Sequence, residues 1–203
     1  SDGFAGRWLV PRLHRFHRAN ADIDVRLATS GVLADFVSDG IDIAIRYGKG
    51  GYTGVTAEFL ADEEVFPVCS PELLTGDHPL CQPADLRHHK LIHDAFRIDW
   101  ATWLQQAGVD RIDPKRGVRF DSATFAVEAA VHGEGVLLGR SALVSADLAS
   151  GRLVRPFDLA LKSAASYYVV YPEGALRQKK VRAFRDWLFA EVAADWVGMP
   201  GKD

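Results

Sequence analysis

Hydrophobic and polar positions follow a helical period in some segments of the chain and a strand period in others. One helical face carries Phe4, Trp8, Leu9, Leu13 and Phe16, so we expect a helix there, with Pro11 in a first turn or at a kink because it lacks a backbone N–H. Other helices are predicted over 31–40, 99–108, 122–133, 141–151 and around 181–192, and strands over 24–28, 41–47, 65–71, 117–121, 135–139 and 166–172. Asp99 is a possible N-cap of the helix over 99–108. The apolar stripe of the last helix comprises Val181, Phe184, Trp187, Leu188 and Val192.

Strands that alternate with helices in this order predict an α/β fold with mostly parallel sheets. Segment 41–47 is nearly continuous in apolar residues, the pattern of a parallel strand covered on both faces. Two short strands, 66–70 and 167–171, each end at a proline and lead into a new α/β run. We expect both to cross between subdomains, so that a middle segment is inserted into an outer domain.

The composition narrows the function. The 203 residues carry a formal net charge of -3, so the chain as a whole has no electrostatic footprint for nucleic acid or an anionic membrane. No apolar run approaches the roughly 20 residues of a membrane span, and residues 1–15 do not read as a secretory leader. Cys69 and Cys81 form no C-x-x-C pair, which predicts neither a disulfide framework nor a metal site and favours the reducing cytoplasm.

The glycine-rich stretch 39–54, "DGIDIAIRYGKGGYTG", does not match the known motifs of a nucleotide-binding site. It lacks the Gly-Lys-Ser/Thr of a phosphate-binding loop and the G-x-G-x-x-G spacing of a dinucleotide fingerprint. We interpret it as a strand-to-loop turn that needs positive φ angles. Arg46 remains of interest, because ligands of open α/β sheets bind at the carboxyl ends of strands.

Catalytic and metal motifs are equally weak. The histidines of "HHKLIHD" (88–94) read as a solvated group near a strand, without H-E-x-x-H, and no G-x-S-x-G elbow exists. Ser122 is expected to cap its helix, although a helix start is also a natural anion site. The start of the first helix, at Gly3 and Phe4, is another. With Arg46, these helix starts would suit a small carboxylate ligand.

Longer strings carry a family resemblance. Residues 4–30, "FAGRWLVPRLHRFHRANADIDVRLATS", and 35–74, beginning "DFVSDGIDIAIRYGKGG", resemble the effector-binding domain of LysR-type transcriptional regulators. The versions "WLVPRL" and "DIAIRYGKG" are similar to the subgroup that regulates glycine cleavage and β-lactamase induction. "FDSATFAVEAAVHGEGVLLGR" and "SYYVVYPEGALRQKKVRAFRDWL" continue the match, which covers residues 4–190 in order.

The resemblance implies a periplasmic-binding-protein-like fold of type 2, with two Rossmann-like subdomains joined by two crossing strands. Residues 1–69 with 171–203 would form subdomain I, and the inserted 70–170 subdomain II. A small-molecule effector, anionic or zwitterionic, would bind in the cleft between them. Transferred by position, the effector contacts implied by the family are Gly3, Phe4, Thr29, Ser30, Arg46, Tyr47, Ser122, Ala123 and Tyr167.

The family also implies a homodimer or homotetramer, which binds promoter DNA only through an N-terminal winged helix-turn-helix that this sequence lacks. Family members often have Ser or Thr where Gly3 stands, and the strand that usually precedes the first helix is absent or truncated here. In the dimers that the family implies, two such domains lie side by side and would pair through apolar residues of two helices. The same apolar residues could instead belong to the core of one chain. The candidate interface residues are Trp8, Leu9, Leu13, Phe16, Phe125 and Val131.

Three functions follow from these observations. The chain is expected to be the sensor domain of a bacterial transcription regulator, without catalytic residues or cofactor. A free-standing solute-binding protein of the same fold is the alternative, which a secretory leader on the gene would favour. A hydrolase that uses His88, His89 or His93 is the third, although no base–nucleophile spacing supports it.

Overall fold

The computed structural model describes residues 2–30, 35–36, 38–96 and 98–196, and it divides into two compact units. Unit 1 comprises Ser1–Ala5, Leu9–Asp62 and Ala164–Asp203, and unit 2 comprises Gly6–Trp8 and Glu63–Ser163. Strands β2 (Thr56–Val68) and β6 (Leu161–Tyr171) contribute residues to both units. The subdomain bounds expected from the sequence fall near the ends of these two strands and stay a prediction.

The N-terminal helix is present, and its hydrogen-bonding pattern changes along its length. Helix α1 (Asp2–Phe4) continues into a π-helical turn (Ala5–Leu9), a 3₁₀ turn (Val10–Arg12) and helix α2 (Leu13–Ala19). Pro11 lies at the start of the 3₁₀ turn, where its missing N–H leaves no helical hydrogen bond unmade. The expected kink at Pro11 therefore takes the form of a local change in helix type.

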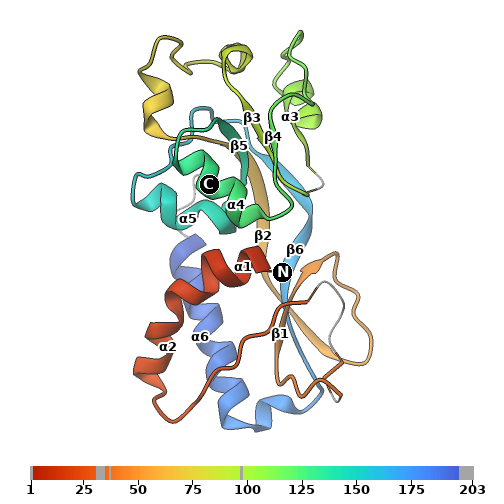
Figure 1. Ribbon diagram of the computed structural model, residues 1–203. Helices are drawn as coiled ribbons and strands as arrows, with labels where there is room; N and C mark the ends of the chain where they lie inside the picture. The colour runs from red at the N-terminus through yellow and green to blue at the C-terminus, as the bar shows by residue number, and fades with distance from the viewer. Residues whose placement is uncertain (1, 31–34, 37, 97, 197–203) are drawn as a thin grey trace. The chain divides into compact units, whose positions relative to one another are not determined.

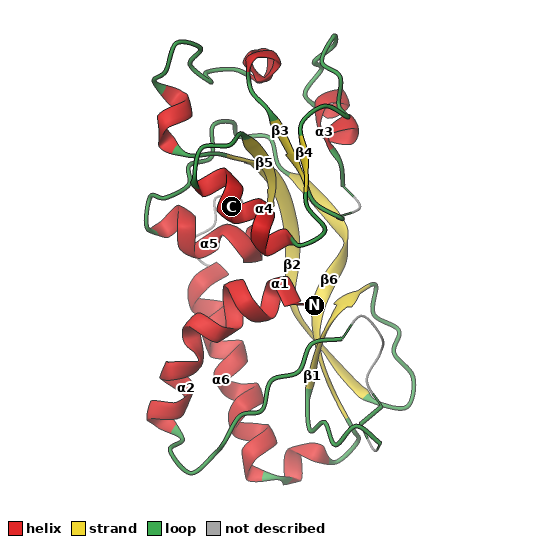
Figure 2. Ribbon diagram, viewed as in Figure 1, coloured by secondary structure: helices red, strands yellow, loops and turns green. Residues whose placement is uncertain are grey.

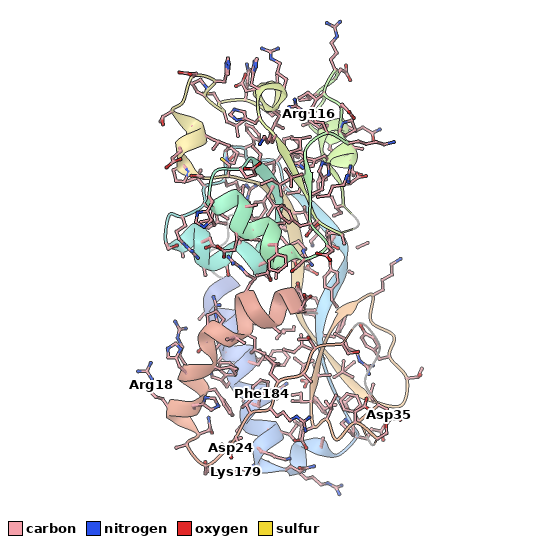
Figure 3. The ribbon with its side chains drawn as sticks, in the orientation of Figure 1. Arg18, Asp24, Asp35, Arg116, Lys179 and Phe184 are labelled. Carbon is pink, nitrogen blue, oxygen red and sulfur yellow. The ribbon has the colours of Figure 1, made fainter. Side chains whose placement is uncertain are left out.

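Unit 1 packs α2 beside the C-terminal helix α6 (Lys179–Trp196), as Figure 1 shows. The rings of Phe16 and Phe184 meet edge to face with centroids 5.2 Å apart, and Figure 3 labels Phe184 on α6. The predicted apolar stripe of α6 is confirmed, since Val181 and Leu188 are 1% and 0% exposed. A 3₁₀ turn (Ala175–Arg177) leads into this helix.

Strand β1 (Ala44–Gly48) corrects one expectation. It pairs antiparallel with β6 and all five of its residues are half-buried, so it is not the parallel strand covered on both faces that its apolar run indicated. The alternating segment 24–28 forms no strand either, because it is largely exposed and pairs with no described strand. The predicted helix 31–40 lies partly outside the described residues.

A charged group in unit 1 links three elements of its core. Glu58 of β2 accepts a hydrogen bond from the Tyr171 hydroxyl of β6 and is paired with the Arg185 guanidinium of α6, whose Nε lies 2.9 Å from the carboxylate. Arg185 holds the pKa of Glu58 below its ordinary value against the opposing effect of burial. Burial and the nearby Glu58 raise the pKa of Tyr171 to about 12.

Unit 2 is built on parallel strands. Among the described residues, β3 pairs in parallel with both β4 and β5, and the end of β2 pairs antiparallel with β5. Helices α4 and α5 cover one face and α3 lies on the other (Figure 2). The elements are 3₁₀ turns at Pro71–Leu74 and Pro83–His88, β3 (Leu91–His93), α3 (Trp100–Gln106), β4 (Val118–Arg119), α4 (Ala123–Val131), β5 (Val136–Arg140) and α5 (Ser141–Ala149).

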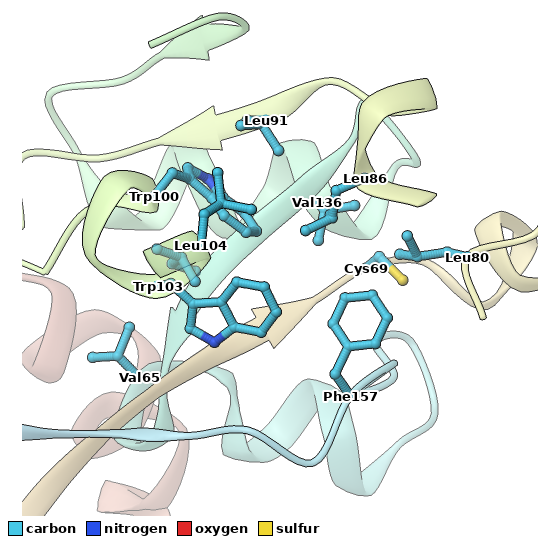
Figure 4. Close-up of a cluster of buried hydrophobic side chains, with 11 residues drawn as sticks. Val65, Cys69, Leu80, Leu86, Leu91, Trp100, Trp103, Leu104, Val136 and Phe157 are labelled. Carbon is cyan, nitrogen blue, oxygen red and sulfur yellow. The ribbon is translucent and has the colours of Figure 1, made fainter. Parts of the chain in front are cut away.

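Two tryptophans fill the α3 face of unit 2 (Figure 4). Trp100 and Trp103 are 1% and 0% exposed, and their indole N–H groups donate to the carbonyl oxygens of Ile92 and Leu159 at 3.0 and 3.2 Å. Each buried indole therefore keeps a hydrogen-bond partner while its ring packs in the core. Helix α3 begins as predicted, because the Asp99 carboxylate accepts the Thr102 N–H at 3.0 Å.

The π-helical turn is joined to α4 and α5 by charges. Arg7 pairs with Glu128 of α4 and with Asp147 of α5, whose side chain is fully buried. Arg152 also pairs with Asp147, from the surface, with 53% of its own side chain exposed. A buried carboxylate needs such partners, because an unpaired charge in the interior is costly.

The two consecutive residues at the unit boundary of β2 have different partners. The Asp62 carboxylate accepts a hydrogen bond of 2.8 Å from Ser166 within unit 1. The Glu63 carboxylate, fully buried, accepts hydrogen bonds of 2.6 and 3.0 Å from the Ser141 hydroxyl and the Ala142 N–H within unit 2. Each side of the boundary in β2 is thus fixed to its own unit.

Both cysteines are free thiols, Cys69 buried and Cys81 exposed. Burial raises the pKa of the Cys69 thiol to about 12. Within the described residues, no helix combines the length and apolar character needed to cross a membrane.

Candidate effector site

Three predicted site residues of unit 1 lie together. Tyr47 of β1 is the register partner of Tyr167 of β6, and their ring centroids are 4.8 Å apart. The ring of Phe4, at the end of α1, lies 4.6 Å from that of Tyr167. Phe4 and Tyr167 are 3% and 2% exposed, and Gly3 beside them is buried. The pairing of β1 with β6 brings Tyr47 to Tyr167, and α1 adds Phe4. We call these three residues the aromatic group.

Arg46 lies on the other face of β1, because successive side chains of a strand alternate. Its guanidinium carbon is 5.2 Å from the ring centroid of Tyr52 and 5.5 Å from that of Phe36. Gly50 and Gly51, in the loop that follows, have φ angles of 78° and 71°. The interpretation of this glycine-rich stretch as a turn with positive φ angles is confirmed.

Thr29 and Ser30 are exposed and end an irregular segment. The residues that follow, 31–34, lie outside the described part of the chain. A hollow of about 270 Å³ in unit 1 is lined by other residues, among them Ile41, Asp42 and Gly174. Asp42 pairs there with Lys180 at 2.6 Å, not with Arg46.

In unit 2, predicted site residues lie at the carboxyl edge of the parallel strands. Ser122 and Ala123 follow β4 and begin α4. Ser122 occupies the N-cap position, but its side chain makes no capping hydrogen bond, which corrects the expectation of a capped helix. Within the described residues, its hydroxyl is not committed to the helix and is available to a ligand.

The same edge holds two charged residues that the sequence did not indicate as site residues. Arg140 ends β5 and Asp94 directly follows β3, and their side chains are 12% and 11% exposed with Nη2 and Oδ2 3.5 Å apart. The signal for Arg140 was the one that singled out Arg46, an arginine at the carboxyl end of an apolar strand.

The predicted interface residues differ in exposure. Trp8, Leu9 and Phe16 are 0%, 2% and 0% exposed, so they belong to the interior of the chain, as the alternative reading held. Leu13 and Val131 are half-buried. Phe125 of α4 is 60% exposed and is the member of this set with the most surface for a partner.

The histidine segment forms a surface group. His88 stacks on His78 with ring centroids 4.4 Å apart, and the side chain of His89 is bonded to the carbonyl oxygen of His78 at 2.8 Å. His93 is largely buried and is bonded to the Arg116 carbonyl oxygen at 2.7 Å. Among the described residues, no group of three or more His, Cys, Asp or Glu is arranged to hold a metal ion.

Known proteins similar to this chain are regulators of transcription. The glycine cleavage system transcriptional activator of Escherichia coli (strain K12) is 41% identical over 192 residues, which are 95% of this chain and 63% of that protein. The transcriptional activator AmpR of Rhodobacter capsulatus is 34% identical over 190 residues, which are 94% of this chain and 64% of that protein. The chain thus spans less than two thirds of the length of these relatives.

A solved structure agrees with them. The effector domain of the transcriptional regulator AmpR of Pseudomonas aeruginosa matches with a TM-score of 0.74 and 33% identity, over 97% of this chain and 94% of that one. The predicted α/β fold of LysR-type effector domains is confirmed. A family model described as the LysR substrate binding domain matches residues 1–193, and the chain belongs to this family.

Proposed function

We propose that this chain is the small-molecule-sensing domain of a LysR-type transcriptional regulator that works in the cytoplasm. The family match over residues 1–193 carries the proposal. The Ser122 hydroxyl, which makes no capping hydrogen bond, supports it, because it offers a polar contact to a small ligand. The relatives named above are transcriptional regulators, which favours a sensor over a solute-binding protein or an enzyme.

The mechanism we propose is a population shift between arrangements of the two units. A small anionic or zwitterionic effector would contact Gly3, Phe4, Thr29, Ser30, Arg46, Tyr47 and Tyr167 of unit 1 and Ser122 and Ala123 of unit 2. Binding changes the equilibrium only as far as the effector prefers one arrangement. In the whole protein, a homodimer or homotetramer would pass this change to the DNA-binding segments.

Two experiments test this proposal. The complete reading frame is expected to encode a winged helix-turn-helix upstream of this chain, and a secretory leader in that place would contradict it. A thermal-shift screen would use amino acids, aromatic and aliphatic carboxylates and muropeptides, because a ligand of the folded state raises Tm. We expect Ser122→Ala and Thr29→Val to weaken binding of a hit by about 0.5–3 kcal/mol.

Matched controls are available for both positions. Ser145 lies on α5, where its hydroxyl bonds its own helix, and Thr53 is exposed in the loop after β1. Ser145→Ala and Thr53→Val should bind the hit like the wild type. Equal binding by Ser122→Ala, Thr29→Val and the wild type would contradict the site assignment.

A further inference from the structure

Arg140 is a largely enclosed guanidinium group in unit 2. Its side chain is 12% exposed, and the ring of Phe96 covers it with 4.6 Å between the guanidinium carbon and the ring centroid. The row of β5 side chains that contains Val136 and Leu138 packs with the α3-face core, and Arg140 continues that row two residues further, at the end of the strand. The charge therefore sits where the apolar face of the sheet reaches the carboxyl edge.

The hydrogen-bond donors of Arg140 are not used by the part of the chain that the structure describes. Within the described residues, no acceptor takes a hydrogen bond from its guanidinium, and its Nε is fully covered without a partner. The Asp94 carboxylate is 3.5 Å away, which fits an ion pair but is too long for a good hydrogen bond. The Asp94 carboxylate accepts a hydrogen bond of 2.9 Å from the Phe96 N–H. It therefore offsets the charge of Arg140 but leaves the N–H donors of the guanidinium without an acceptor.

Arg116 shows what a structural arginine looks like in the same unit. It is partly buried as well, and its Nε also lacks a partner, but its Nη2 donates to the carbonyl oxygens of Leu86 and His89. Figure 3 labels it near the loops that it joins. Buried polar groups are normally satisfied in this way, so an enclosed guanidinium without an acceptor indicates a partner that the described chain does not supply.

The position of Arg140 indicates that this partner is a ligand. Because β3 runs parallel to β4 and β5, the carboxyl ends of the strands share one edge, which carries Asp94, Ser122 and Arg140. That edge is where ligands of α/β sheets bind. A planar guanidinium with free donors fits the two oxygens of a carboxylate or of a phosphate.

We propose that Arg140 binds an oxyanion of the effector, a carboxylate or a phosphate, with Asp94 as the positioning residue that holds the guanidinium. The proposal rests on the sensing function and names the charge of its ligand. It also moves the anion contact from Arg46, which lies against Tyr52 and Phe36, to unit 2.

The test observes the Arg140 side chain directly. In the ¹⁵N-labelled chain, the arginine Nε–H resonances are recorded, and Arg140→Lys identifies the one that disappears. Acetate, benzoate and succinate are the carboxylate probes, inorganic phosphate is the phosphate probe, and acetamide, benzamide and succinamide are neutral matches. Sodium chloride holds the ionic strength constant, so that general screening is the same in every sample.

We expect at least one carboxylate, or phosphate, to shift the Arg140 Nε–H resonance to saturation, while the amides leave it in place. The two arms identify the oxyanion. The resonance of Arg119 is the control. This exposed arginine ends β4 on the same edge, and its Nη2 already donates to the carbonyl oxygen of Lys115. An Arg140 resonance that no probe moves, or that amides move equally, would overturn the proposal.

Affinity measurements on variants complete the test. Arg140→Gln should bind the active probe about tenfold more weakly or worse, Arg140→Lys should keep part of the affinity, and Arg119→Gln should bind normally. Thermal melting checks that the variants are folded. The resonance shifts of the wild-type chain test the proposal even if a variant does not fold. A neutral ligand that needs Ser122 but not Arg140 would overturn the anion contact and leave the sensing function standing.

Discussion

Ser141 donates a hydrogen bond of 2.6 Å to the carboxylate of Glu63, a side chain with no exposed surface. The same carboxylate accepts the Ala142 N–H, so a buried charge is satisfied by the first residues of α5. Glu63 is the first residue of unit 2 on β2, and its hydrogen bonds attach this part of the strand to the start of α5.

Ser141→Ala should therefore destabilise the chain by about 1.5–3 kcal/mol, because hydrogen bonds to charged groups are stronger than neutral ones. Urea unfolding followed by circular dichroism measures the change. Ser145→Ala, later in the same helix, removes a hydroxyl that bonds only the Ala142 carbonyl oxygen at 3.3 Å and should cost about 0.5 kcal/mol or less. Equal losses for the two variants would contradict the importance of Glu63.

Arg7→Ala should destabilise the chain by about 3–5 kcal/mol, because it leaves the buried Asp147 carboxylate poorly compensated. Arg152→Ala removes the other partner of Asp147, but that side chain is 53% exposed, so the loss should stay near 0–1 kcal/mol, roughly the value of a surface pair. Urea unfolding of both variants is the measurement. A larger loss for Arg152→Ala would reverse this ranking.

Phe4→Ala should cost about 3–5 kcal/mol, the usual loss for a buried aromatic ring, because Phe4 is 3% exposed and packs on Tyr167. Phe125→Ala is the matched control, since its ring is 60% exposed and its removal should change stability by about 0.5 kcal/mol or less. Thermal and urea unfolding compare the two variants. A mild loss at Phe4 would show that the aromatic group is loosely packed.

Phe125 gives a separate prediction for self-association. We expect Phe125→Asp to raise the dissociation constant of the proposed homodimer without lowering the stability of the monomer, because a charge replaces an exposed apolar side chain on α4. Analytical ultracentrifugation over a range of concentrations measures this. An unchanged dissociation constant would place the interface elsewhere.

The ion pair of Glu58 predicts an acid dependence of stability. Its pKa in the folded chain lies below the ordinary value of 4.5, chiefly because Arg185 donates to it. A folded pKa below the unfolded one means that this stabilisation is present above the unfolded pKa and is lost as pH falls through the folded pKa. Glu58→Gln should therefore show a shallower fall in the free energy of unfolding between about pH 5 and pH 3.

Tyr171, which contacts Glu58, predicts a pH dependence of stability in the opposite direction. Its folded pKa, raised from 10.0 to about 12, stabilises the chain below the unfolded pKa, and that contribution is lost as pH rises toward the folded value. Tyr171→Phe should flatten the alkaline side of the pH profile. An alkaline side as steep in Tyr171→Phe as in the wild type would contradict this assignment.

Local signals in the sequence predicted local structure well. Asp99 and Thr102 stand three residues apart, which is all that an N-cap requires, and the helical spacing of Val181, Phe184 and Leu188 identifies α6 without knowledge of its neighbours. The antiparallel pairing of β1 was missed because an apolar run shows that a strand is covered but not which strand pairs with it.

Contacts between distant segments needed the structure. The contact between the rings of Tyr47 and Tyr167 depends on the register of β1 and β6, and a shift of one residue would place Arg46 there instead. The unsatisfied guanidinium of Arg140 is also invisible in the sequence, since any arginine after a strand could find an acceptor. The family resemblance supplied Tyr167 as a site residue, but it did not supply Arg140.

The two thiols differ enough to be told apart by a chemical reagent. Because the thiolate is the reactive form, the buried Cys69, with a pKa of about 12, should react far more slowly with a maleimide or iodoacetamide than the exposed Cys81. The natural chain thus offers a single attachment point for a fluorophore or spin label in unit 2, without any substitution. A second cysteine introduced into unit 1 would convert effector binding into a measurable distance between two dyes.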